Sequence, residues 1–125
     1  MIIDDNELDL FVSSTLLRLF KFSDEIQTNN CAITSLDYLK KQVQLRTKGS
    51  GIFPDVVIVD HNMPKMDGFQ FLEKFHEVFP DKAYRPKPVV LSSTLSPKDI
   101  IRISAISKDI LALEKPLSKE LIDQI

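Results

Sequence analysis

Short apolar runs alternate along the chain with longer segments in which apolar residues recur at helical spacing. Four of the runs predict strands, at residues 1–3, 55–60, 88–92 and 110–113. The run at 55–60 contains consecutive β-branched residues, which is typical of a strand buried on both faces in a parallel sheet. Residues 24–28 predict a weaker, more polar strand, suited to a sheet edge.

The segments between these runs have the apolar spacing of amphipathic helices. The first spans residues 7–20, where a stripe of large apolar residues is expected to face the core. Ser96 can cap a later helix, because Pro97 suits its first position and Asp99 favours its positive end. The stripe of the first helix consists of Leu8, Phe11, Val12, Leu16, Leu19 and Phe20, and further helices are predicted at 32–43, 68–79, 96–106 and from Ser118 onward.

Strand and helix therefore alternate five times. Such alternation implies right-handed crossovers and an open parallel sheet with helices on both faces, an α/β, doubly wound (βα)5 fold. A length of 125 residues with 43% hydrophobic composition suits one domain over residues 1–125.

Composition narrows the classes of partner. The chain has 16 Lys and Arg against 18 Asp and Glu and no basic block, which argues against nucleic acid as a partner. Cys31 is the only cysteine, so no intramolecular disulfide can form, and a partly buried thiol is expected. An acidic start without an apolar run of ~18 residues predicts no signal peptide, no membrane span and a cytoplasmic protein.

Polar and charged side chains follow four of the predicted strands. Because ligands bind beyond the carboxyl ends of parallel strands, these side chains should meet at one edge of the sheet. Each of these residues taken alone could have a purely structural role, as a helix cap, a turn residue or a solvated surface lysine. The set comprises Asp4 and Asp5, Asp60, Ser92 and Ser93, and Lys115.

The chemistry of this set favours a magnesium-assisted phosphoryl site. Three crowded carboxylates repel one another, and a hard divalent cation such as Mg²⁺ relieves that repulsion. Lys115 is a suitable point charge for a phosphate. Zinc is less suitable, because the two histidines and the cysteine do not cluster at ligand spacing.

Four motifs, in this order and spacing, resemble those of the receiver domain of two-component response regulators, and the resemblance covers essentially the whole chain. They are IIDDN at residues 2–6, VIVDHNMPKMDG at 57–68, VLSS at 90–93 and LEKPL at 113–117. The resemblance implies a flavodoxin-like sheet with strand order 2-1-3-4-5. It also implies a signalling domain that catalyses only its own phosphotransfer and dephosphorylation, and so is not an enzyme acting on other substrates.

The resemblance also implies a role for each site residue. Asp60 would accept a phosphoryl group from a sensor histidine kinase or a histidine phosphotransfer protein. Asp4, Asp5, Asp60 and the backbone carbonyl of Asn62 would hold Mg²⁺. Ser92 would donate its hydroxyl to the phosphoryl group, and Lys115 would pair with Asp60 or its phosphate. The bond between Lys115 and Pro116 would be cis.

Three positions depart from the family pattern or leave a choice open. Ala112 stands where many receivers carry a switch aromatic, so weaker coupling to residues 93–113 is expected. Ser93 competes with Ser92 for the hydroxyl role, and the end of the strand decides between them. His61 is expected to be a partly exposed loop residue that could tune access to Asp60 or hydrolysis of its phosphate.

The domain is expected to signal by contacting a downstream protein, whose identity the sequence does not give. It is expected to be a monomer or a dimer that forms on phosphorylation. The chain would be a stand-alone receiver or one cut from a longer protein. Two alternatives remain. A pseudo-receiver would keep the fold without phosphorylation. A phosphatase of the haloacid dehalogenase type would need a second Asp where Asn62 stands.

Overall fold

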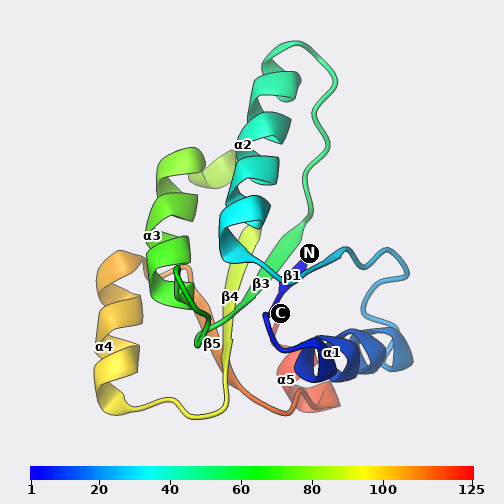
Figure 1. Ribbon diagram of the computed structural model, residues 1–125, viewed down its shortest axis with the longest axis vertical. Coiled ribbons are helices and arrows are strands. Elements are labelled where there is room, and N and C mark those ends of the chain that lie inside the picture. The colour runs from blue at the N-terminus through cyan, green and yellow to red at the C-terminus, as the bar shows by residue number, and fades with distance from the viewer.

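The computed structural model describes residues 1–125 and contains one five-stranded parallel sheet with strand order β2-β1-β3-β4-β5 (Figure 1). The α/β fold and the strand order expected from the sequence are thus confirmed. The strands are β1 (Ile2–Ile3), β2 (Thr28–Asn29), β3 (Val56–Asp60), β4 (Lys87–Ser92) and β5 (Leu111–Glu114).

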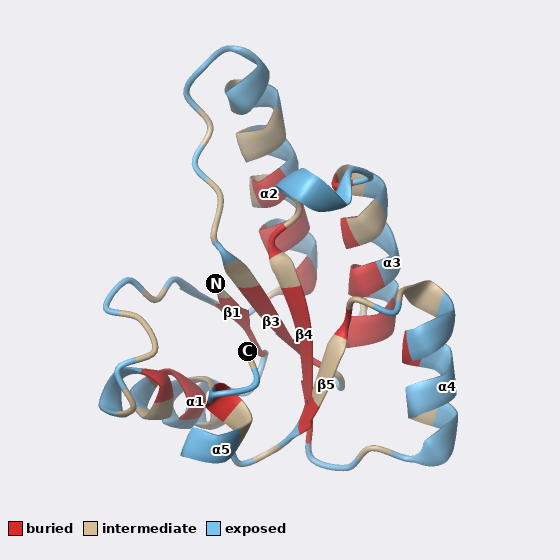
Figure 2. Cartoon of the chain, turned by 180° about the vertical axis from the view of Figure 1, so that it is seen from behind, coloured by how far each residue is buried: buried red, intermediate tan, exposed pale blue.

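Helices cover both faces of the sheet (Figures 1 and 2). Helices α1 and α5 lie on one face, and α2, α3 and α4 lie on the other. No helix is both long enough and apolar enough to cross a membrane. The helices are α1 (Glu7–Leu19), α2 (Ala32–Thr47), α3 (Gly68–Val78), α4 (Pro97–Ile106) and α5 (Lys119–Ile122), with a 3₁₀ turn at Lys82–Tyr84.

Alternation along the strands divides the core into two layers. Successive side chains of a strand point to opposite faces, so Val59 packs under α2, α3 and α4 while Ile58 packs towards α1 and α5. The same alternation separates Val90 from Leu91 on β4. It also decides which way the polar residues that follow each strand point.

The predicted strand at 24–28 is wrong over most of its length, because β2 is Thr28–Asn29. Its only neighbour is β1, which offers the two partners Ile2 and Ile3. The preceding residues have no strand beside them to complete a ladder. The length of β2 is therefore set by β1, and local composition does not show this.

Helix α1 is rotated away from the orientation that its apolar stripe predicts. Leu8, Phe11 and Leu19 are 69%, 67% and 66% exposed, whereas Ser13 and Leu17 are buried against the sheet. A large apolar area of α1 therefore faces outward beside the carboxyl edge of the sheet. Leu16 and Phe20, which belong to the same predicted stripe, do pack against the core.

Candidate functional site

The loop between β1 and α1 is held by its own polar groups. The side chain of Asn6 caps α1 by accepting a hydrogen bond from the backbone N–H of Asp9 at 3.0 Å. Asp4 Oδ1 accepts from the backbone N–H of Asn6 at 2.9 Å. Asn6 rather than Asp4 or Asp5 is therefore the cap, which leaves Asp4 Oδ2 and the Asp5 carboxylate facing the sheet edge.

Lys115 binds three carboxylates at this edge. Its Nζ lies 2.8 Å from Asp60 Oδ1, 2.8 Å from Asp4 Oδ2 and 3.0 Å from Asp9 Oδ2. The backbone N–H of Lys115 donates to the carbonyl of Ser92 at 2.7 Å, which fixes the loop after β5 against the end of β4. The peptide bond between Lys115 and Pro116 is cis, as the family resemblance implied.

Asp9 is a site residue that the sequence interpretation missed. It stands in the first turn of α1, and its ion pair with Lys115 lies on the face of the helix that is turned towards the sheet edge. Ser13 and Leu17 lie one and two turns further along the same face and are buried. The sequence clue to Asp9 was its position, an acidic residue in the first turn of a helix and four residues after Asp5. The predicted apolar stripe indicated a different face of that helix, so Asp9 was not assigned to the site.

The carboxylates of Asp4, Asp5 and Asp60 form a compact cluster. One oxygen from each lies within 4.8 Å of the others. Asp4 and Asp60 are buried and Asp5 is exposed. Burial raises the pKa of Asp60, the hydrogen bond from Lys115 opposes this, and the negative charges of Asp4 and Asp5 raise it further.

Lys115 remains an ammonium ion in this environment. Burial lowers the pKa of Lys115, but its hydrogen bonds with Asp4, Asp60 and Asp9 outweigh burial, so the net shift is upward. Four carboxylates thus lie around one ammonium group, which pairs with three of them. The excess negative charge is carried by hard oxygen donors, and the cluster contains no histidine or cysteine ligand, so it fits Mg²⁺ and does not fit zinc.

The loop between β3 and α3 requires a glycine. A Cβ on Gly68 would lie 2.5 Å from the carbonyl oxygen of Asp60 and 3.0 Å from the Cα of His61. Its backbone N–H donates to the carbonyl of His61 at 2.9 Å. Asp67 caps α3 in a reciprocal pair with Gln70. Asn62 lies exposed in the same loop.

Ser92 is buried at the end of β4 but makes no hydrogen bond with Asp60. Asp60 pairs in register with Leu91, so Ser92 lies one residue further and points to the other face. Its Oγ donates to the carbonyl of Thr94 at 2.7 Å and lies 3.3 Å from His61 Nδ1. The strand ends at Ser92, and Ser93 is exposed beyond it.

His61 is half-buried, which agrees with the sequence expectation. Its ring packs on Phe69, with the ring centroids 4.2 Å apart. No spacing in the sequence indicates its contact with Ser92, because His61 follows β3 and Ser92 ends β4. Ala112 is half-buried on β5 and packs under the α2, α3 and α4 layer.

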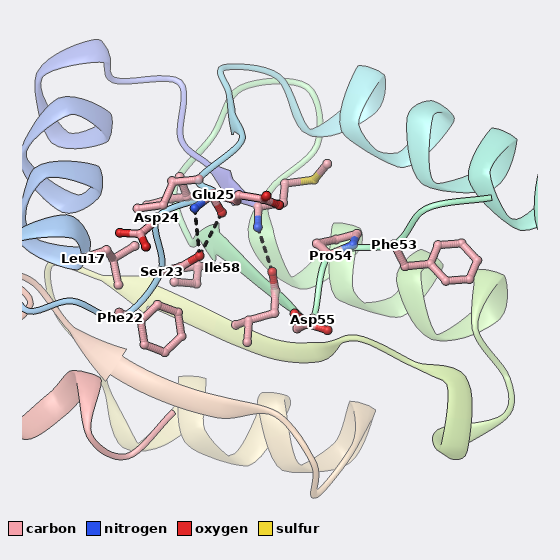
Figure 3. Close-up of a pocket in the computed structure, with 13 residues that line it drawn as sticks. Leu17, Phe22, Ser23, Asp24, Glu25, Phe53, Pro54, Asp55 and Ile58 are labelled. Carbon is pink, nitrogen blue, oxygen red and sulfur yellow. Dashed lines mark hydrogen bonds between the residues drawn. The ribbon is translucent and has the colours of Figure 1, made fainter. Parts of the chain in front are cut away.

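A sizeable cavity lies elsewhere, near the amino ends of the strands (Figure 3). It has a volume of about 560 Å³ and is lined by Phe22, Phe53, Asp55 and ten other residues. It contains none of the predicted site residues. The polar cluster at the carboxyl edge is therefore the candidate functional site, as the topology of open α/β sheets favours.

The chain is similar in sequence and in structure to known proteins. A curated relative, protein-glutamate methylesterase/protein-glutamine glutaminase 1 of Photobacterium profundum, is 36% identical over 98 residues, which is 78% of this chain and 23% of that protein. The chain thus spans about a quarter of that relative's length. The activity in that name belongs to the relative as a whole.

Two solved structures share the fold. A two-component response regulator from Cytophaga hutchinsonii has a TM-score of 0.76 at 23% identity, over 98% of this chain and 89% of that one. The receiver domain of the histidine kinase CKI1 from Arabidopsis thaliana, complexed with Mg²⁺ and BeF₃⁻, has a TM-score of 0.82 at 17% identity, over 98% and 85%. The family profile of the response regulator receiver domain matches residues 1–125, and the chain belongs to that family.

Proposed function

We propose that Asp60 accepts a phosphoryl group from a phosphohistidine and that the modified domain changes its protein contacts. The observation that carries this proposal is the position of buried Asp60, 2.8 Å from the Lys115 ammonium and within a cluster of carboxylates. A nucleophilic carboxylate needs a neighbouring positive charge to accept further negative charge, and Lys115 supplies it.

The reaction transfers the phosphoryl group from nitrogen to oxygen. A carboxylate oxygen of Asp60 attacks the phosphorus, the bond between phosphorus and the histidine nitrogen breaks, and its electron pair returns to the imidazole. Lys115 then pairs with the phosphoryl oxygens, while Asp4 and Asp9 keep its ammonium in place. Asp4, Asp5, Asp60 and the backbone carbonyl of Asn62 would hold Mg²⁺, which neutralises charge on the transferring group.

The proposed switch uses Ser92. Its hydroxyl turns from the carbonyl of Thr94 to a phosphoryl oxygen on Asp60, and the loop after β4 moves with it. That the strand ends at Ser92 supports this residue over exposed Ser93. The expected output is contact with a downstream protein through residues 93–113.

The exposed apolar area of α1 supports docking of a protein donor. It lies on the helix whose first turn contributes Asp9 to the site, so a partner bound there can bring its phosphohistidine to Asp60. Apolar residues exposed together on one helix commonly mark a protein-binding surface. We call the surface formed by Leu8, Phe11, Val12 and Leu19 the α1 patch.

Mass spectrometry after incubation with acetyl phosphate and Mg²⁺ tests the proposal. Wild type should gain one phosphoryl group, and Asp60→Ala should gain none. Asp55→Ala is the matched control, because Asp55 is an exposed acid just before the same strand, and it should behave like wild type. An adduct that persists in Asp60→Ala, or its absence from wild type, would contradict the assignment, and the latter would favour a pseudo-receiver.

A further inference from the structure

His61 connects three elements that meet beside the proposed phosphorylation site. Its backbone N–H donates to the carbonyl of Leu91 at 3.0 Å, and its carbonyl accepts from Gly68 at 2.9 Å. Its ring lies between the Ser92 hydroxyl, 3.3 Å from Nδ1, and the ring of Phe69. These backbone hydrogen bonds hold the Cα of His61 in place. The imidazole ring can therefore move only by side-chain rotation, which changes its contacts with Ser92 and Phe69.

The hydrogen-bond pattern assigns the proton on this ring. The carbonyl of Thr94 can only accept, and at 2.7 Å it is the closest partner of the Ser92 hydroxyl, so the hydroxyl proton lies on that bond. A hydroxyl has one proton. In this hydrogen-bond pattern Nδ1–H of His61 is the donor to Ser92 Oγ, so Nδ1 carries a proton.

Phe69 extends this contact to α4. The guanidinium of Arg102 lies over the Phe69 ring, with Cζ 4.6 Å from the centroid, and its Nη2 is 4.0 Å from Glu73 Oε1 on α3. His61 and Arg102 therefore contact the same aromatic ring. A rotation of the His61 ring changes the packing of Phe69, and Phe69 carries that change to α4.

We propose that His61 is a positioning residue that holds the Ser92 hydroxyl in its resting direction and transmits its release, through Phe69, to Arg102 on α4. This inference rests on the proposed phosphorylation of Asp60. When the hydroxyl turns to the phosphoryl group, Ser92 Oγ moves away from Nδ1–H, and the ring must turn to find another acceptor. Ala112 has no ring to perform such a relay from β5, so the stack formed by His61, Phe69 and Arg102 provides the route.

Ring-nitrogen NMR of the wild-type protein tests this proposal without any substitution. The chain has two histidines, and His76 is an internal reference because its Nδ1 lies 2.8 Å from the carbonyl of Leu72, far from the site along α3. His61 should show the Nδ1–H pattern at rest and change on addition of Mg²⁺ and beryllofluoride, while His76 stays unchanged. An Nε2–H pattern on resting His61, or no change on binding, would overturn the proposal.

Two variants then separate the hydrogen bond from the stacking. His61→Phe keeps a ring against Phe69 but has no donor, and His61→Gln restores an N–H donor. Losing a hydrogen bond of ordinary strength should shift the resting ratio of α4 conformations about fivefold, seen as movement of the α4 amide signals towards their beryllofluoride-bound positions. His61→Gln should reverse part of that movement. Wild-type resting positions in His61→Phe would contradict the role of the donor.

The mass-spectrometric experiment keeps this inference separate from the proposed function. If wild type forms no adduct at Asp60, the proposed function fails and this inference fails with it. If the adduct forms at Asp60 but the His61 ring signals do not respond to beryllofluoride, only the inference fails.

Discussion

Lys115 joins three carboxylates that come from β3, the loop after β1 and the first turn of α1. Its side chain is 13% exposed, so these ion pairs are poorly screened by solvent. Removing the ammonium would leave buried Asp4 and Asp60 without their shared partner, which is costly for buried charge. Lys115 therefore contributes to the stability of the resting site as well as to the proposed chemistry.

Magnesium should stabilise the folded protein, because the cation relieves repulsion among carboxylates that the unfolded chain keeps apart. At a free magnesium concentration ten times its dissociation constant, the free energy of unfolding should rise by about 1.4 kcal/mol. Urea denaturation followed by circular dichroism measures this change. Asp5→Asn should lose most of the gain, whereas Asp37→Asn, at an exposed position on α2, should keep it. Equal stabilisation of both variants would argue against the assigned ligands.

His76 should make stability depend on pH. Burial lowers the pKa of His76, a hydrogen bond with the Leu72 carbonyl opposes this, and Arg85 and Asp109 have smaller, opposing effects. As pH falls through about 6.5, the unfolded chain binds the proton first, so the free energy of unfolding falls, by at most ~1.4 kcal/mol per pH unit from this group. His76→Leu should flatten the profile between pH 7 and pH 5. Parallel profiles for the two proteins would refute this.

At the scale of elements, four of the five strands followed from the sequence pattern and the strand order from the family resemblance, whereas most of β2 and the rotation of α1 did not. The runs that form β3 and β4 are apolar on both faces, which is typical of central strands in a parallel sheet covered by helices on both sides. Only part of the predicted stripe of α1 faces the sheet: Leu16 and Phe20 pack against the core, and Leu8 and Phe11 are exposed. Asp9, which pairs with Lys115, lies on the same helix face as buried Ser13. The local pattern does not show which of these residues the sheet covers.

The site shows the same division between local and long-range information. Asp4, Asp5, Asp60 and Lys115 could be predicted to meet because each follows a strand of the same parallel sheet. The contact between His61 and Ser92 could not, because it depends on the register between β3 and β4. Sequence spacing within either strand contains no information about that register.

The α1 patch should contribute to recognition of a protein donor. Phe11→Glu should slow phosphotransfer roughly 5- to 30-fold, as expected when one apolar anchor is lost from an interface. The donor would be a histidine kinase found by screening to phosphorylate the wild-type chain, with acetyl phosphate as the reference donor. Ile52→Glu is the control, because Ile52 is 75% exposed and lies away from α1. A similar loss in both variants would show that exposed charge, and not the patch, is responsible.

At the scale of the whole molecule, the two apolar layers are unequal. The layer under α2, α3 and α4 contains 15 buried residues, and the layer under α1 and α5 contains 8. The carboxylates that bind Lys115 come from β3 and from the segment at the start of α1, beside the smaller layer. His61, Phe69 and Arg102 lie on the side of the larger layer, so the two parts of the proposed switch rest on different cores.

The brevity of the outer strands has a consequence for how copies of the molecule meet. An edge strand exposes unpaired backbone groups, and a long one can add the strand of a neighbouring molecule. Here β2 has two residues, Thr28 and Asn29, and β5 has four and ends at Glu114. Edge strands this short expose few unpaired backbone N–H and C=O groups with which a neighbouring molecule could extend the sheet. Any dimer that phosphorylation induces should therefore form through helix surfaces, and the ordered state should resist fibre formation by strand addition.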